Sequence, residues 1–369
     1  MMLKFFKNLA VYLFLFIIAD IIFSNFIYKD KFKHSCKESI GSQGFFHLSA
    51  NCSIQEKYIK YSRPYKVLTD GNGLRYSGVL RDSDKENVIF FGDSFTYGLG
   101  LNYEDTFIGL LEKKFRKYNF LNYSVIGYSP SVYLYQLEKI VHSNINVKKI
   151  ILPLDITDFS EESSGWNYKK GDNYPKRFNF IKKNEKLKKE SFKDKNLKAS
   201  RFIASKVNNF FRNVKLNRLY KDKNRNKKKT PGKTVIGNFL YTPIDQTDQN
   251  LWKPLGFNGG LKKLESNISE ISLLAKKINA EFHILIYPWP DTLEFGQKQF
   301  NLEQFSTALC LKIYCMSTIN TFSEFEEVRK TDKENWLNKL YILGDLHVNK
   351  FGHKLIADKI STEVFSNEK

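Results

Sequence analysis

The stretch that decides the fold reads Asn87-Val-Ile-Phe-Phe-Gly-Asp-Ser-Phe-Thr-Tyr-Gly98. Its apolar run, Val88 to Phe91, is typical of a strand buried on both faces. The run stops at Gly92, so Ser94 comes just past the strand end, where a parallel sheet presents side chains to a crevice. A hydroxyl in this position is a candidate nucleophile, and it needs a base nearby. The apolar face of a following helix is formed by Phe107, Leu110, Leu111 and Phe115.

The candidate base lies near the other end of the chain. The segment Tyr341-Ile-Leu-Gly-Asp-Leu-His-Val-Asn-Lys-Phe-Gly352 contains Asp345 and His347, and an amphipathic helical pattern follows it. A serine, an imidazole and a carboxylate that orients the imidazole form a catalytic triad, whatever their order in the chain. The sequence therefore predicts Ser94 as nucleophile, His347 as general base and Asp345 as its orienting group. A weaker alternative base is His353.

The chain between these two motifs predicts alternating strands and helices. Besides the strand at 88–91, strands are expected over 119–125, 149–154, 281–287 and 311–316. A long amphipathic helix is expected over Leu261 to Ile278. An alternating series of this kind implies a parallel sheet with helices on both faces. We therefore predict an α/β fold, a three-layer α/β/α sandwich around a five-stranded, mostly parallel, flavodoxin-like sheet.

Two sequence blocks carry a family resemblance. Gly92-Asp93-Ser94 resembles the first block of the SGNH (GDSL-type) hydrolase family, and Asp345-Leu-His347-Val-Asn349-x-x-Gly352 resembles its last block. The aspartate here lies two rather than three residues before the histidine, and Val348 stands where the family has proline. The resemblance covers residues 65–160 and 235–365. It implies transfer of an acyl group through an ester on that serine, to water or to a carbohydrate hydroxyl, with no cofactor and no metal ion.

The same resemblance assigns an oxyanion hole, the donors that stabilise the negative oxygen of the intermediate. Gly127, in Ile126-Gly-Tyr-Ser-Pro130, matches the glycine of the family's second block. The third block is matched in part by Asp155-Ile-Thr-Asp158, with Thr157 where the family has asparagine. A threonine hydroxyl can donate one hydrogen bond. The implied donors are the N–H groups of Ser94 and Gly127 and the hydroxyl of Thr157, and no substrate-binding residue is identified.

Residues 1–28 predict a membrane segment. Leu9 to Phe23 is apolar except for one aspartate, and extension to Ile27 reaches the roughly 20 residues that a spanning helix needs. No small-residue cleavage site follows, which favours an uncleaved anchor over a signal peptide. A buried N-terminal helix is a further alternative. Residues 29–64 are expected to form a juxtamembrane segment, and the α/β domain is expected over 65–366.

The four cysteines fall into two local pairs, Cys36 with Cys52 and Cys310 with Cys315. An even set in local pairs favours two disulfides in an oxidising compartment. Four cysteines allow three connectivities, and four free thiols are the alternative. The spacings do not match a zinc finger or ribbon. We therefore expect a periplasmic or extracellular domain, although the lysines that follow the membrane segment do not by themselves favour that orientation.

The net charge of +20 is concentrated in one stretch. Residues 176–233 hold 22 Lys and Arg against 4 Asp and Glu, within a lysine-rich insertion predicted over 167–234. Apolar residues recur at helical spacing from Phe202 to Val214, and a basic helix with an aromatic face is typical of a protein that binds an anionic membrane surface. Nucleic-acid binding is the competing interpretation of this charge. A solvated helical insertion that covers the site is the third.

Together these features predict a membrane-anchored serine ester hydrolase or O-acyltransferase. The resemblance and the anchor imply an O-acyl ester as substrate, in particular an O-acetylated cell-surface glycan. The alternative is a catalytically inactive protein of the same fold that binds an anionic membrane or a polyanion. The two differ in whether ester hydrolysis depends on Ser94.

Overall fold

The chain divides into two compact units, Met1–Lys33 with Lys183–Pro231, and His34–Lys182 with Gly232–Lys369. The computed structural model describes residues 2–22, 36–41, 44–58, 64–143, 145–178, 234–236, 239–241, 252–297, 300–343 and 345–366.

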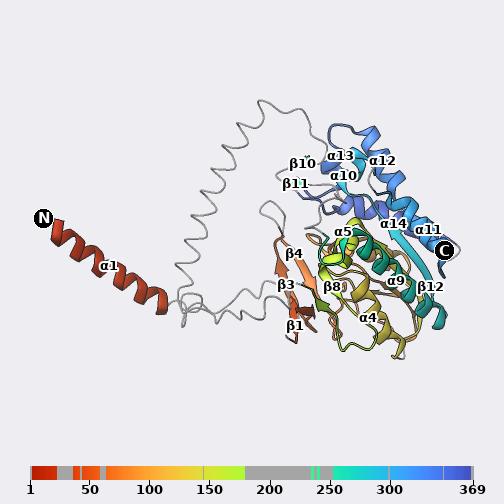
Figure 1. Cartoon of the computed structure of the whole chain (residues 1–369), viewed down its shortest axis with the longest axis horizontal. Coiled ribbons are helices and arrows are strands. Elements are labelled where there is room, and N and C mark those ends of the chain that lie inside the picture. The colour runs from red at the N-terminus through yellow and green to blue at the C-terminus, as the bar shows by residue number, and fades with distance from the viewer. Residues whose placement is uncertain are drawn as a thin grey trace. The chain divides into compact units, whose positions relative to one another are not determined.

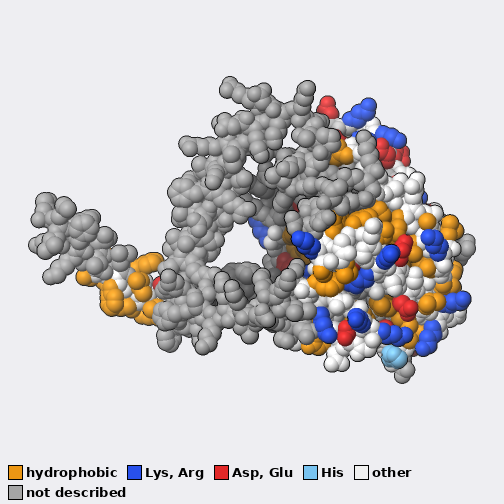
Figure 2. Space-filling view, in the orientation of Figure 1, with side chains coloured by type: hydrophobic (Ala, Val, Ile, Leu, Met, Phe, Trp, Pro, Cys, Tyr) orange, Lys and Arg blue, Asp and Glu red, His pale blue; other side chains and the backbone are white. Residues whose placement is uncertain are grey.

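In the smaller unit the described residues form helix α1 (Met2–Ile22). Within the described ranges, no helix combines the length and the apolar character needed to cross a membrane. The helix predicted from Phe202 to Val214 lies outside the described residues, as does most of the lysine-rich insertion. On the face of the larger unit drawn in Figure 2, basic and acidic side chains are interspersed.

A five-stranded parallel sheet forms the centre of the larger unit (Figure 1). Its strands are β5 (Glu86–Phe90), β6 (Tyr118–Asn122), β7 (Val147–Leu154), β12 (Glu281–Ile286) and β13 (Ser317–Asn320). They lie in the order β6-β5-β7-β12-β13. The first strand of the sheet therefore lies between the second and the third, which is the flavodoxin-like order. The predicted fold class is confirmed.

Helices cover both faces of this sheet. The helices α4 (Pro130–Val141), α9 (Gly256–Lys277) and α11 (Leu302–Lys312) contribute to one apolar core, and the helices α3 (Phe107–Lys114), α12 (Phe322–Thr331) and α14 (Lys350–Val364) to the other. Alternate residues of β5 and of the position just after it belong to different cores. Ile89 and Phe91 belong to the first core, and Val88 and Phe90 belong to the second. Burial on both faces explains why this strand reads as a continuous apolar run.

Shorter elements complete the larger unit. The helical ones are α2 (Ser94–Tyr97), a 3-10 turn (Tyr103–Asp105), α5 (Ile156–Ser160), a π-helical segment (Glu161–Gly165), α10 (Pro290–Phe295) and α13 (Trp336–Leu340). Two-stranded pairs are formed by β1 (Lys37–Ile40) with β2 (Phe45–Leu48), β3 (Ser53–Glu56) with β4 (Tyr65–Leu68), β8 (Trp166–Asn167) with β9 (Lys176–Arg177), and β10 (Thr234–Ile236) with β11 (Phe239–Tyr241).

The strand predicted over 311–316 is wrong. Helix α11 continues to Lys312, and the last strand of the sheet begins only at Ser317. The apolar run belongs to the end of the helix, where Leu311 is 84% exposed, and to a turn closed by the Cys310–Cys315 disulfide. Helix and strand cannot be told apart by periodicity in so short an apolar run.

Residues 36–58 fold within the larger unit and contribute three strands to it. The disulfide Cys36–Cys52 closes this segment, and the Cys52 N–H donates to Thr69 Oγ1 at 2.8 Å. The two predicted local disulfides are therefore both present. Strand β3 pairs with β4, which places the residues just after β3 next to the α/β domain rather than in a separate segment.

Candidate active site

The two predicted motifs meet in space. His347 Nε2 lies 2.8 Å from Ser94 Oγ, and His347 Nδ1 lies 2.7 Å from Asp345 Oδ2. The side chains of Asp345 and His347 are buried, while Ser94 is partly exposed. A hydroxyl, an imidazole and a carboxylate are thus joined in one hydrogen-bonded chain, with the hydroxyl at the accessible end. This is the geometry of a nucleophile activated by a general base.

The turn after β5 sets the position of Ser94. Gly92 has a φ of +141°, and a Cβ at that position would collide with the Thr96 side chain, so the tight turn requires glycine. Asp93 caps helix α2 by accepting a hydrogen bond from the Phe95 N–H at 2.9 Å. Ser94 therefore begins helix α2 at the carboxyl end of β5. This strand lies between β6 and β7, which is the point where the strand order of the sheet reverses.

A buried arginine supports the end of the same helix. Arg75 is 0% exposed, and its guanidinium donates hydrogen bonds to the carbonyl oxygens of Tyr97, Gly98 and Leu101. Its Cζ also lies 4.6 Å from the ring centroid of Tyr97. A guanidinium presents five donors in a rigid fork, which suits several carbonyls in one turn. Arg75 therefore fixes the backbone that immediately follows Ser94.

The loop that carries Asp345 and His347 is shaped by the remaining residues of its motif. The Asn349 side chain accepts from the N–H groups of Phe351 and Gly352 and donates to three carbonyls of the preceding turn. A Cβ on Gly352 would collide with Val348 and with the carbonyl of Leu340. The asparagine and the glycine of the block therefore have structural roles, because they hold the histidine loop against helix α14.

His347 is the histidine that reaches Ser94, and His353 has a different role. His353 is buried, its ring stacks on Phe107, and its Nδ1 accepts a hydrogen bond from the Phe107 N–H at 3.1 Å. Burial lowers the pKa of His353 to about 3, so this side chain is neutral at working pH. It joins α14 to α3 and does not contact the serine, which excludes it as the base in this arrangement.

The charge state of Asp345 suits an orienting group. Burial raises the pKa of Asp345, but the hydrogen bond and charge of His347, together with backbone N–H groups, outweigh this and hold the pKa below its usual value. The carboxylate therefore stays ionised and keeps its hydrogen bond to His347 Nδ1. This fixes the tautomer in which Nε2 is free to accept the serine proton.

The loop with Gly127 lies beside the serine loop. The Val125 N–H donates to Gly92 O at 3.1 Å, and the Tyr128 N–H closes a turn onto Val125 O at 3.1 Å. Gly127 has a φ of +79°, which favours glycine, and its carbonyl accepts from Trp166 Nε1 at 2.7 Å. The structure thus brings the first and second sequence blocks together at the same edge of the sheet.

A buried carboxylate holds the start of α4, just after this loop. Glu162 is 0% exposed and accepts hydrogen bonds from Ser129 Oγ at 2.5 Å, from the Ser131 N–H at 2.7 Å and from Asn267 Nδ2 at 2.8 Å. Lys263 Nζ lies 3.3 Å from the same carboxylate. No motif in the sequence indicates this cluster, because its members come from three separate segments.

The hydroxyl of Thr157 is engaged elsewhere. Thr157 Oγ1 donates to Asp155 Oδ1 at 2.5 Å, and the Thr157 N–H donates to the same oxygen at 2.7 Å. A hydroxyl has a single proton to donate. Because that proton goes to Asp155, this geometry does not support the prediction of Thr157 as the third oxyanion donor.

Three buried carboxyl groups lie behind the serine turn. Burial raises the pKa of Asp93, Asp155 and Asp158, and the charge of Asp155 raises the pKa of the other two further. Asp155 is also held by Trp289 Nε1 at 3.2 Å, and the Trp289 ring stacks on Phe95. This cluster links the ends of β5, β7 and β12. Among the described residues, no group of three His, Cys, Asp or Glu side chains is arranged to hold a metal ion.

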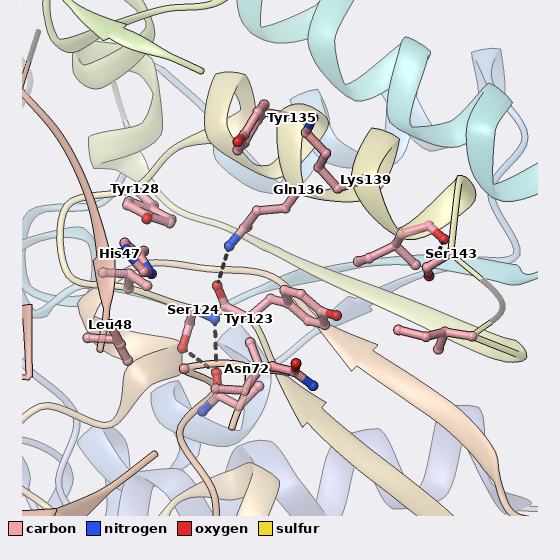
Figure 3. A pocket seen from close by; sticks show the side chains of 16 residues that line it. His47, Leu48, Asn72, Tyr123, Ser124, Tyr128, Tyr135, Gln136, Lys139 and Ser143 are labelled. Atoms are coloured by element: carbon pink, nitrogen blue, oxygen red, sulfur yellow. Dashed lines mark hydrogen bonds between the residues drawn. The ribbon is translucent and has the colours of Figure 1, made fainter. Parts of the chain in front are cut away.

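A pocket of about 290 Å³ lies beside the edge strand β6 (Figure 3). Its walls come from β2, the loop after β4, the connection from β6 to α4, and α4 itself. At its centre Gln136 Nε2 donates to the Tyr123 carbonyl at 3.0 Å. Ser94, Asp345 and His347 do not line this pocket. It is therefore not the place where a substrate would meet the serine.

The sequence matches no protein family model and no curated protein. Solved structures that the fold resembles include a member of the lipolytic G-D-S-L family from Veillonella parvula, at 14% identity and a TM-score of 0.41, which covers 76% of this chain and 98% of the other. An esterase from Pseudoalteromonas is similar at 13% identity and a TM-score of 0.38, over 76% and 98% of the two chains. An acetyl-xylooligosaccharide esterase from Geobacillus is similar at 11% identity and a TM-score of 0.39, over 77% and 96%.

The Veillonella protein is described as a member of the lipolytic G-D-S-L family, the family that the two sequence blocks resemble. The likeness concerns the α/β/α architecture. What this chain does with that architecture depends on its own side chains, above all on the contact between Ser94 and His347.

Proposed function

We propose that the protein is a serine ester hydrolase or O-acyltransferase of the SGNH type that works through an acyl ester on Ser94. The observation that carries this proposal is the unbroken chain from Ser94 Oγ to His347 Nε2 and from His347 Nδ1 to Asp345, at 2.8 and 2.7 Å. An isolated serine hydroxyl is a weak nucleophile, and this arrangement is the one that activates it.

In the first step Ser94 Oγ attacks the carbonyl carbon of an ester while its proton passes to His347 Nε2. The tetrahedral intermediate then collapses, the bond to the leaving oxygen breaks, and the imidazolium returns the proton to the leaving alcohol. In the second step water or a sugar hydroxyl attacks the acyl-serine and gives its proton to His347. Ser94 Oγ leaves and takes that proton back, so the enzyme is regenerated and no external oxidant or reductant is used.

For the oxyanion hole we propose the N–H groups of Ser94 and Gly127. Ser94 is the first residue of α2, and Gly127 lies in the connection between β6 and α4. The hydrogen bond from the Val125 N–H to Gly92 O joins the two segments. Donors of this kind are effective because they are fixed before the reaction begins.

We propose an O-acetylated glycan outside the cytoplasm as the substrate. The two disulfides in the described part of the domain support an oxidising compartment. The apolar N-terminal stretch supports a site near a membrane, where cell-surface glycans are found.

The test is hydrolysis of p-nitrophenyl acetate by the full chain. Ser94→Ala is expected to reduce kcat/KM by about 10³-fold or more, to the background rate. The matched control is Ser269→Ala, because this helical hydroxyl donates to Glu265 O on the outer helix α9 and is expected to leave the rate unchanged. Full activity in Ser94→Ala would overturn the proposal. Mass spectrometry with an oligosaccharide acceptor then separates transfer to sugar from hydrolysis.

A further inference from the structure

A tyrosine from the N-terminal segment reaches the two buried members of the triad. Tyr58 Oη lies 3.2 Å from His347 Nδ1 and 3.4 Å from Asp345 Oδ1. The Tyr58 ring meets the imidazole edge-on, with centroids 5.4 Å apart and planes at 89°. These contacts are longer than the 2.7 Å bond between Asp345 and His347, so the tyrosine adds to that bond and does not replace it.

The protons of this cluster can be assigned. His347 Nδ1–H donates to Asp345 Oδ2, which leaves Asp345 Oδ1 as an acceptor for the Tyr58 hydroxyl. Burial, and then the Asp345 carboxylate, raise the pKa of Tyr58 above its usual value, so the hydroxyl keeps its proton. A carboxylate has room for several donors, and the second one restricts its rotation. With that assignment Tyr58 Oη, 3.2 Å from Nδ1, can act only as a second acceptor for the Nδ1–H.

The tyrosine is held from two sides. It follows β3, whose last pair joins Glu56 to Tyr65, and the Tyr65 hydroxyl donates to Glu56 Oε2 at 2.5 Å. On the other side, a Cβ added at Gly100, in the loop after α2, would lie 3.5 Å from the Tyr58 ring. The ring therefore packs between the loop that follows the serine helix and the histidine loop.

We infer that Tyr58 is a positioning residue of the active site, which fixes Asp345 and His347 in the orientation that serves Ser94. The inference rests on the proposed function, because it gives a fourth residue to the same hydrogen-bonded chain. It also gives residues 36–58 a role in the reaction: this segment supplies part of the site that the α/β sheet does not.

The first readout is kinetic. Tyr58→Phe keeps the ring and removes the hydroxyl. It is expected to lower kcat for p-nitrophenyl acetate about two- to tenfold, with KM unchanged, because the hydrogen bond to the Asp345 carboxylate is a long one of 3.4 Å. The matched control is Tyr168→Phe, because the Tyr168 hydroxyl also donates to a carboxylate, that of Glu138, and within the described residues it makes no contact with the triad. It is expected to keep the wild-type kcat.

The second readout does not depend on turnover. The His347 Nδ1 proton should give a far-downfield proton resonance in NMR spectra, assigned by its loss in His347→Ala. We expect this resonance to shift in Tyr58→Phe and to stay in place in Tyr168→Phe. An unchanged resonance in Tyr58→Phe overturns the inference, whatever happens to kcat. Failure of the esterase proposal would appear separately, as full activity in Ser94→Ala, so the two results are distinguishable.

Discussion

Replacement of Arg75 tests whether its buried guanidinium stabilises the turn that follows Ser94. In Arg75→Met the carbonyl oxygens of Tyr97, Gly98 and Leu101 lose the guanidinium as donor. The Gly98 carbonyl still accepts from the Leu101 N–H at 3.1 Å, so the other two are left without this partner. Each buried carbonyl left without a partner costs about 1–3 kcal/mol. Removal of the buried charge offsets part of this cost, because a buried charge carries a desolvation penalty. The two carbonyls together cost about 2–6 kcal/mol, and after the offset we expect a net loss of about 1–4 kcal/mol in the free energy of unfolding.

Urea unfolding followed by circular dichroism measures this loss. The control is Arg329→Met, because Arg329 makes partly exposed ion pairs with Glu326 and Glu294, and such pairs contribute about 0–1 kcal/mol. Arg75→Lys keeps the charge but lacks the fork, and is expected to fold with a lower kcat because the turn after Ser94 is less well held. If Arg75→Met were as stable as Arg329→Met, the proposed support of this turn would be wrong.

Two further predictions concern buried carboxyl groups. Thr157→Val is expected to lower kcat less than tenfold, because the Thr157 hydroxyl donates its proton to Asp155. Loss of an oxyanion donor lowers kcat about 10²–10³-fold, so a decrease of that size would show that Thr157 is an oxyanion donor. Burial raises the pKa of Asp291 from 3.8 to about 7. Because the folded-state pKa exceeds the unfolded one, this group lowers stability progressively as pH rises between these values. Asp291→Asn should therefore raise the thermal midpoint more at pH 8 than at pH 5, and an equal gain at both would contradict the assignment.

The sequence alone was sufficient to predict the α/β/α architecture and the contact among Ser94, His347 and Asp345. Ser94 follows a strand that must be buried on both faces, and alternating strands and helices bring the carboxyl ends of all strands to one edge. The loop with Asp345 and His347 lies between α13 and α14, and it meets the Ser94 turn at this edge. The strand predicted over 311–316 failed because a short apolar run fits a helix end equally well.

Other features depend on contacts that no local pattern records. Tyr58 and Arg75 lie in segments without a motif, and their roles follow from where β3 and β4 pack. The direction of the Thr157 proton depends on Asp155, two residues away, and residue type alone does not fix it. The sequence offers only weak indications of these roles. Arg75 follows two glycines, and Tyr58 comes shortly after the loop closed by the Cys36–Cys52 disulfide. Neither is specific without the fold.

Labelling with a fluorophosphonate, which reacts with activated serines, tests whether His347 activates Ser94. We expect peptide mapping by mass spectrometry to find one adduct on Ser94, no adduct in Ser94→Ala, and much slower labelling in His347→Ala. An adduct on a different serine, or labelling of His347→Ala at the wild-type rate, would contradict the account of Ser94 as a nucleophile activated by His347.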